Sequence, residues 1–285
     1  MSEPAADPAI HPETLSLQMT DGARADLMLY RPQGPVRACL LWVPAMGVSA
    51  RHYQAFARAL AARGVVVGVH EWRGHGSSDR RAGRRQDWGY RELLGDDLPH
   101  SLDALRAAAP GAPVLLGGHS LGGQLACLLA STTPVPLSGV VLVATGAPYW
   151  RRFKPWTYGA YVFAPLLAKL VGRLPGHSIG FGGNEARGVI ADWGRSGRTG
   201  RYAARGMPVD FEAALARQKA PVHAWLLRED WLAPLSSLEW LQGKMPAAAH
   251  TTAILSSDDL GGAAADHFAW MKAPDAVAAR IANAI

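Results

Sequence analysis

Short runs of consecutive apolar residues alternate along this chain with segments in which apolar residues recur every three or four positions. The runs predict buried strands, and the wider spacing predicts amphipathic helices. The expected strands are 38–43, 65–70, 113–116, 139–144, 222–227 and 251–255. The expected helices are 53–62, 97–109, 120–131, 235–243 and 275–284. This alternation predicts an α/β fold, with a mostly parallel central sheet covered by helices on both faces. An earlier pair, 14–19 and 25–30, predicts a leading antiparallel hairpin.

The middle of the chain, residues 148–210, departs from this rhythm. It is rich in aromatic residues, glycine and arginine, and it carries one apolar stripe at helical spacing, made of Phe163, Leu166, Leu167, Leu170, Val171 and Leu174. Packing on the main domain would account for the stripe. Its place in the chain also favours a helical lid, because ligands of open α/β sheets bind beyond the carboxyl ends of the strands. We therefore expect a core in two parts, 1–147 and 211–285, with a lid inserted at 148–210.

One short motif carries the clearest chemical signal. Residues 118–122 read Gly-His-Ser-Leu-Gly, between a predicted strand and a predicted helix. A serine on a sharp strand-to-helix turn has a strained backbone and needs small neighbours, which Gly118 and Gly122 supply. The turn would expose the Ser120 hydroxyl and direct the helix N-terminus at an oxyanion formed there. Ser120 is thus the predicted nucleophile.

Charge and composition narrow the setting. The chain of 285 residues has a formal net charge of +6, and 145–210 holds ten Lys and Arg against three Asp and Glu. The bases are dispersed and no nucleic-acid motif accompanies them, so we expect no nucleic-acid partner. The two cysteines, Cys39 and Cys127, lie in apolar runs and are expected to be buried thiols. Thiols that form neither a disulfide nor a metal site predict a reducing, cytoplasmic location. Residues 1–12 are unlike a signal peptide, and no apolar run of about 18 residues occurs.

Three further segments resemble the α/β-hydrolase superfamily, and within it the bacterial serine-aminopeptidase-like or lysophospholipase-like group. Residues 71–78, Glu-Trp-Arg-Gly-His-Gly-Ser-Ser, are similar to the Asp-x-Arg-Gly-x-Gly-x-Ser turn after the fourth strand. Residues 230–234 resemble the Asp-x-x-x-Pro after the seventh strand, and His267-Phe268 lie near the end. One departure concerns the third strand, which in this superfamily ends in His-Gly and here ends in Pro44-Ala45.

The resemblance implies a Ser, acid, His order along the chain. His267 follows the last strand and is the predicted base. No Asp or Glu occurs from 139 to 184, so an acid after the sixth strand is disfavoured, and Asp230 is the predicted acid. Glu229 is its main rival, with Asp258 and Asp259 as more distant alternatives.

The remaining predicted site residues surround this triad. The backbone N–H groups of Met46 and Leu121 are expected to form the oxyanion hole. His119, Trp150, Trp156 and Trp193 are expected to line the substrate pocket, with the basic residues of 148–210 at its rim. No cofactor and no metal are predicted. The predicted function is a serine hydrolase cleaving an ester, thioester or amide with an apolar acyl group through an acyl-enzyme. An acyltransferase or a binding protein on the same fold remains the alternative. Contact with a membrane surface and the oligomeric state stay open.

Overall fold

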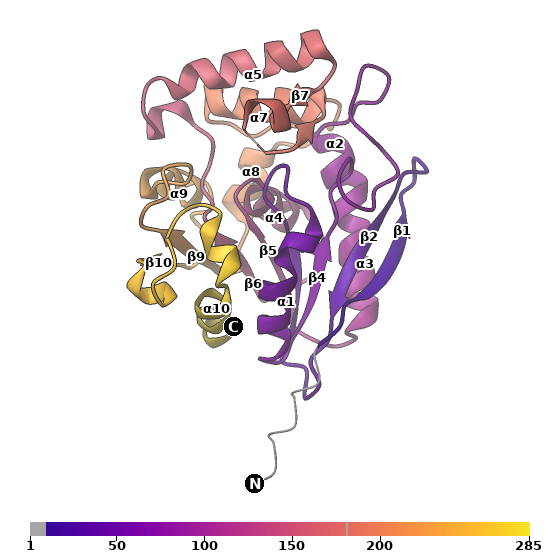
Figure 1. Cartoon of the computed structure of the whole chain (residues 1–285), viewed down its shortest axis with the longest axis vertical. Helices are drawn as coiled ribbons and strands as arrows, with labels where there is room; N and C mark the ends of the chain where they lie inside the picture. The colour runs from indigo at the N-terminus through magenta and orange to yellow at the C-terminus, as the bar shows by residue number, and fades with distance from the viewer. Residues whose placement is uncertain (1–9, 181) are drawn as a thin grey trace.

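The computed structural model describes residues 10–180 and 182–285 (Figure 1). Residues 1–9, which are most of the N-terminal stretch 1–12 predicted from its composition to be a loose arm, and the aromatic residue at 181 lie outside the described residues. Within the described ranges, no helix combines the length and the apolar character needed to cross a membrane.

An eight-stranded sheet forms the centre of the molecule (Figure 1). Its strands, in spatial order, are β1 (Glu13–Gln18), β2 (Arg24–Tyr30), β4 (Val65–His70), β3 (Ala38–Val43), β5 (Val114–His119), β6 (Gly139–Val143), β9 (Val222–Leu227) and β10 (His250–Leu255). The pairs β1–β2 and β2–β4 are antiparallel, and all other pairs are parallel. The predicted leading hairpin and the mostly parallel sheet are confirmed.

Two apolar layers hold helices against the two faces of this sheet. One layer joins Leu41 of β3 to α3 (Leu98–Ala108), α4 (Leu121–Thr132), α8 (Phe211–Arg217) and α9 (Leu235–Gln242). The other joins Leu40 and Trp42 to α1 (Gln54–Ala61) and α10 (Asp275–Ala284). Neighbouring residues of a strand point to opposite faces, so β3 contributes to both layers. Cys39 and Cys127 are buried free thiols, as expected.

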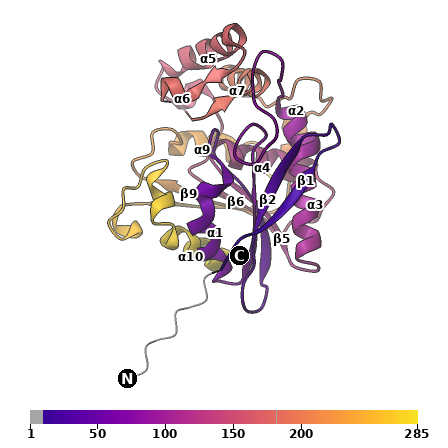
Figure 2. The same cartoon turned by 45° about the vertical axis from the view of Figure 1, so that its right-hand side comes forward.

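The segment predicted to form a lid, residues 148–210 and called the lid segment below, lies at the carboxyl end of the parallel strands (Figures 1 and 2). Its two main helices, α5 (Thr157–Val171) and α7 (Arg187–Thr199), pack against each other. Between them come β7 (Leu174–Pro175), α6 (Gly176–Ile179) and β8 (Asn184–Glu185), and β7 pairs with β8. A short connection, α2 (Tyr90–Glu92), and a π-helical turn at 93–97 precede α3.

The apolar stripe of α5 is only partly buried. Ala168 and Leu174 pack with Ile190 of α7, and Leu167 contacts this cluster. Four other members of the stripe are exposed, by 41% to 73%: Phe163, Leu166, Leu170 and Val171. Packing on the main domain, one of the two explanations of the stripe, does not account for these four residues, because α5 is the outermost helix and only its inner side meets α7 (Figure 2).

Candidate active site

Ser120 occupies a strained turn between β5 and α4. Its φ of 56° lies in the left-handed region, where side chains other than glycine are rarely found. The neighbouring backbone is crowded: a Cβ at Gly118 would come within 2.4 Å of the Gly122 carbonyl carbon, and one at Gly122 within 2.1 Å of Val43 O. Both positions therefore require glycine, which explains the motif around this serine.

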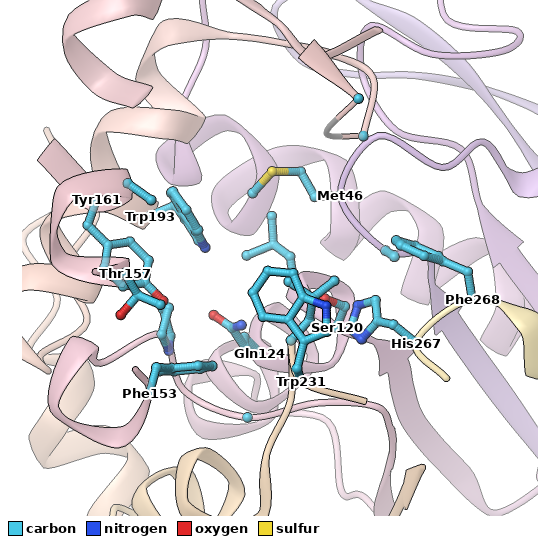
Figure 3. Close-up of a pocket in the computed structure, with 18 of the residues that line it drawn as sticks. Met46, Ser120, Gln124, Phe153, Thr157, Tyr161, Trp193, Trp231, His267 and Phe268 are labelled. Atoms are coloured by element: carbon cyan, nitrogen blue, oxygen red, sulfur yellow. The ribbon is translucent and has the colours of Figure 1, made fainter. Parts of the chain in front are cut away.

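His267 and Asp230 form a buried pair beside this turn. His267 Nδ1 lies 2.7 Å from Asp230 Oδ2. The other carboxylate oxygen of Asp230 accepts the backbone N–H groups of Leu232 and Ala233 at 2.8 and 3.1 Å. Ser120 and His267 both line one cavity and lie side by side in Figure 3. No hydrogen bond joins Ser120 Oγ to His267 among the described residues.

The rival acids lie in other surroundings. Glu229 is exposed, and its carboxylate accepts a hydrogen bond from Ser257 Oγ at 3.3 Å. Asp259 pairs with Arg280 at 2.6 Å, and Asp258 is exposed. The structure thus brings Asp230, and none of its three rivals, into contact with His267. The catalytic roles of the three residues remain predictions.

The two predicted oxyanion donors border the same cavity as Ser120. Leu121 begins α4, and Met46 lies in the loop after β3. Neither backbone N–H donates a hydrogen bond to another described residue, so both are free to meet a substrate oxygen. Their location fits the requirement of an oxyanion hole for preorganised backbone donors.

The cavity in front of Ser120 has a volume of about 300 Å³ and is mainly apolar (Figure 3). Predicted residues Trp156 and Trp193 line it, together with several that sequence reasoning missed: Gln124, Phe153, Thr157, Tyr161, Trp231 and Phe268. Thr157 and Tyr161 are one helical turn apart, so their spacing on α5 was a usable signal. Trp156 of the lid segment and Trp231 of the loop after β9 are both largely exposed, with ring centroids 5.6 Å apart.

Two predicted pocket residues lie elsewhere. Trp150 does not line the cavity and packs on Tyr158, with ring centroids 5.3 Å apart. His119 is fully buried and hydrogen-bonds Tyr53 through Nδ1 at 2.8 Å. His119 does not line the cavity; its ring packs behind the lining residues His267 and Phe268, with centroid distances of 4.8 and 5.7 Å. Burial holds the pKa of His119 well below its usual range, and nearby His267 lowers it further.

The basic residues of the lid segment do not surround this cavity. Among the described residues, the cavity is lined by no Lys, Arg, Asp or Glu. Lys169, Arg195 and Arg198 line a separate groove of about 980 Å³ between α2, α5 and α7. The expected basic rim does not appear in the lining of this cavity: α7 contributes Trp193 to the cavity, and Arg195 and Arg198 to the groove. The described residues also contain no cluster of His, Cys, Asp and Glu suited to a metal ion.

Comparison with known proteins places this site in a family. The family model described as "Serine aminopeptidase, S33" matches residues 34–189, more than half of the chain. The chain belongs to this family. That membership confirms the predicted superfamily and group. The matched residues include Ser120 and the loop that carries Met46.

Curated relatives and solved structures agree with this placement. The chain is 31% identical to human monoglyceride lipase over 124 residues, which is 44% of this chain but only 40% of the lipase. The mouse protein of the same name is 27% identical over the same length. Among solved structures, a thermostable carboxyl esterase from Bacillus coagulans has a TM-score of 0.63 at 16% identity, covering 96% of this chain and 97% of the esterase. A hydrolase from Pseudomonas aeruginosa has a TM-score of 0.61 at 20% identity, covering 95% and 97%. These likenesses establish the α/β-hydrolase fold.

Proposed function

We propose that this chain is a serine carboxylic ester hydrolase that cleaves esters of apolar acyl groups through an acyl-enzyme. The observation that carries the proposal is Ser120 on its strained turn, sharing one apolar cavity with a histidine that is bonded to a buried aspartate. A serine hydroxyl needs a base to remove its proton, and the base needs an acid to orient it.

The proposed reaction has two halves. His267 takes the proton of Ser120 Oγ as that oxygen attacks the ester carbonyl, and the resulting oxyanion is held by the N–H groups of Met46 and Leu121. The intermediate collapses as His267 gives its proton to the leaving alcohol, which leaves an acyl group on Ser120. Water, activated by His267, then attacks the acyl-enzyme and releases the acid. Asp230 keeps the imidazole in the required tautomer throughout.

The shape of the cavity supports a particular substrate class. Its volume of about 300 Å³ and its aromatic lining suit a medium-length acyl chain. Among the described residues no Lys, Arg, Asp or Glu lines the cavity, so an acyl group with a charged end would be buried there without an ion-pair partner. The similarity to monoglyceride lipases adds support for monoesters of glycerol. Thioesters and amides, and transfer to an acceptor other than water, are the alternatives.

The lid segment has a proposed role of its own. It supplies Phe153, Trp156, Tyr161 and Trp193 to the cavity, so we propose that residues 148–210 act as a lid over Ser120. Its outer helix α5 exposes a row of apolar side chains near Lys169 and Arg173. An apolar face bordered by bases is suited to an anionic lipid surface, and we propose that α5 contacts such a surface.

An ester series tests the proposed function. Chromogenic p-nitrophenyl esters with acyl chains from two to sixteen carbons, and a monoacylglycerol, would be offered to the wild type and to Ser120→Ala. We expect turnover to peak at medium chain length and to disappear in Ser120→Ala with the fold intact. Equal turnover by both proteins would refute the proposal. Transfer of the acyl group to an added alcohol in preference to water would favour the acyltransferase.

A further inference from the structure

A single residue of the oxyanion loop, Ala45, is held by two buried side chains. The hydroxyl of Tyr53 accepts the backbone N–H of Ala45 at 2.9 Å. The indole Nε1–H of Trp72 donates to the carbonyl of Ala45 at 3.0 Å. All three residues are buried. Both polar groups of Ala45 are therefore fixed by side chains from outside the loop, 8 and 27 residues further along the chain.

These bonds set the direction of the next peptide group. The carbonyl of Ala45 and the N–H of Met46 belong to the same planar peptide, in which they point in opposite directions. With the carbonyl turned toward Trp72, the N–H of Met46 points to the other side of the loop. Ala45 and Met46 both line the cavity that contains Ser120.

Tyr53 is in turn held by His119. The hydroxyl oxygen of Tyr53 accepts the Ala45 N–H and lies 2.8 Å from His119 Nδ1. Among the described residues this nitrogen is the acceptor within reach of the Tyr53 proton, so we assign that proton to the bond with His119. With this assignment Nδ1 is the unprotonated nitrogen of a neutral ring, and the proton sits on Nε2, which is buried and has no hydrogen-bond partner among the described residues. Burial lowers the pKa of His119 and raises that of Tyr53, so both groups stay neutral in the physiological range.

The same ring reaches the base on its other side. The centroid of His119 lies 4.8 Å from that of His267 and 5.4 Å from that of Trp270. Trp270 Nε1–H donates to the His267 carbonyl at 3.1 Å. One buried group of side chains thus contacts the segment of the base and, through Tyr53, the loop of the oxyanion donor.

We infer that Tyr53 and His119 are positioning residues that fix the Ala45–Met46 peptide as an oxyanion donor, an inference that rests on the proposed function. This chain has Pro44-Ala45 where its superfamily has His-Gly, so its loop has a different local sequence. The buried hydroxyl of Tyr53 and the neutral ring of His119 supply the fixed geometry from outside the loop. Preorganised donors stabilise the transition state more than the bound substrate, so the effect belongs to kcat.

The test compares Tyr53→Phe with a matched variant, Tyr30→Phe. Both remove one buried phenolic hydroxyl, but the Tyr30 hydroxyl has no hydrogen-bond partner among the described residues. For the best p-nitrophenyl ester, we expect kcat of Tyr53→Phe to fall by about 10- to 100-fold with KM within about twofold, as for a weakened oxyanion donor. Tyr30→Phe should remain close to the wild type.

A second readout separates positioning from a general structural effect. An alkyl trifluoromethyl ketone adds Ser120 Oγ to its carbonyl carbon and forms an oxyanion, whereas the corresponding alcohol binds without this step. Inhibition by the ketone should weaken in Tyr53→Phe by the same factor as kcat, while inhibition by the alcohol should not change. Equal behaviour of Tyr53→Phe and Tyr30→Phe in an active enzyme would overturn the inference alone. A wild type without ester turnover would overturn the proposed function as well.

The wild-type protein offers a test that does not depend on how a variant folds. Nitrogen-15 NMR of the histidine rings should find His119 neutral from pH 5 to 9, with its proton on Nε2. A proton on Nδ1, or a ring that titrates in this range, would contradict the proposed chain in which the Ala45 N–H donates to the Tyr53 hydroxyl and that hydroxyl donates to His119 Nδ1.

Discussion

At the scale of single residues, the site depends on one strained serine and on the glycines that permit its turn. The strain at Ser120 persists because β5 and α4 are both buried and fix the ends of the turn. The space around the turn is filled by backbone atoms at the end of β3 and the start of the following loop, chiefly Val43 O and Pro44 O. Ser120, the proposed nucleophile, and the loop after β3, the proposed source of an oxyanion donor, are therefore packed together and must fold together.

This packing predicts a large effect of one methyl group. In Gly122→Ala the new Cβ would lie 2.1 Å from Val43 O, so β3 or α4 must shift. We expect a loss of about 3 kcal/mol or more in the free energy of unfolding, measured by urea denaturation. Gly159→Ala is the control, because it adds a methyl in α5 with no atom within 4 Å and should be neutral or stabilising by up to about 1 kcal/mol. Equal stability of the two variants would show that the turn is not crowded.

The assignment of Asp230 as the acid predicts that substitutions at Asp230 and at its neighbour Glu229 differ sharply in their effect on kcat. Asp230→Asn removes the charge that orients His267 and should lower kcat by about 10³-fold or more. Glu229→Gln should stay close to the wild type, because that carboxylate is exposed and contacts Ser257. Steady-state kinetics on one ester decides the matter. The reverse pattern would move the acid to Glu229.

At the scale of elements, the lid segment contacts the core beside the loop after β3, which carries Met46. His75 of the loop after β4 lies 3.1 Å from Glu185 of β8, and both side chains are about nine-tenths buried. Beside them the backbone of Gly183 lies against Gly47, so close that a Cβ on Gly47 would fall 1.9 Å from the Gly183 nitrogen. Any opening of the lid segment at this end would have to break these contacts.

The His75–Glu185 pair predicts a pH dependence of stability. Burial lowers the pKa of His75, and the charge of Arg81 lowers it further. The hydrogen bond and the charge of Glu185, together with the charge of Glu71, raise it by more, so the pKa of His75 is raised in the folded state. The pair's contribution is therefore complete below about pH 6.5, the unfolded pKa, and is lost as the pH rises through the folded pKa. The wild type should exceed Glu185→Gln in unfolding free energy by about 1 to 3 kcal/mol at pH 5.5. The difference should shrink toward pH 9, and a difference that grows with pH would contradict the sign.

The exposed face of α5 predicts a role in lipid contact. Phe163→Gln/Leu170→Gln should weaken binding to anionic phospholipid vesicles by about tenfold or more, since each side chain buries apolar area in the lipid. Turnover of a soluble ester should not change, because neither residue lines the cavity. Leu235→Gln, an exposed leucine on α9, is the control and should bind like the wild type. Equal vesicle binding by all three proteins would exclude α5 as the contact.

At the scale of the whole molecule, local patterns predicted most of the core. The expected strands and helices of the main domain appear within a few residues of their predicted ends, because buried strands and amphipathic helices leave a local signal in the sequence. The serine turn was also predictable, since its two glycines and the flanking elements are adjacent in the chain. The buried His267–Asp230 contact matches the residues that the superfamily order suggested.

Features set by tertiary contacts were not predictable in this way. The stripe on α5 has the same spacing whether it faces protein or solvent, so its exposure had no local signal. The net charge of the lid segment does not depend on where each base lies, so it could not predict that Arg195 and Arg198 line a separate groove. Trp231 and Phe268 approach the cavity only because the loops after β9 and β10 converge on Ser120.

Covalent labelling tests the central claim most directly. The wild type, Ser120→Ala and Tyr30→Phe would be treated with a fluorophosphonate, digested and analysed by mass spectrometry. We expect a single phosphonate adduct on Ser120 in the wild type and in Tyr30→Phe, and no adduct in Ser120→Ala. An adduct on another residue, or undiminished labelling of Ser120→Ala, would contradict the assignment of Ser120 as the nucleophile.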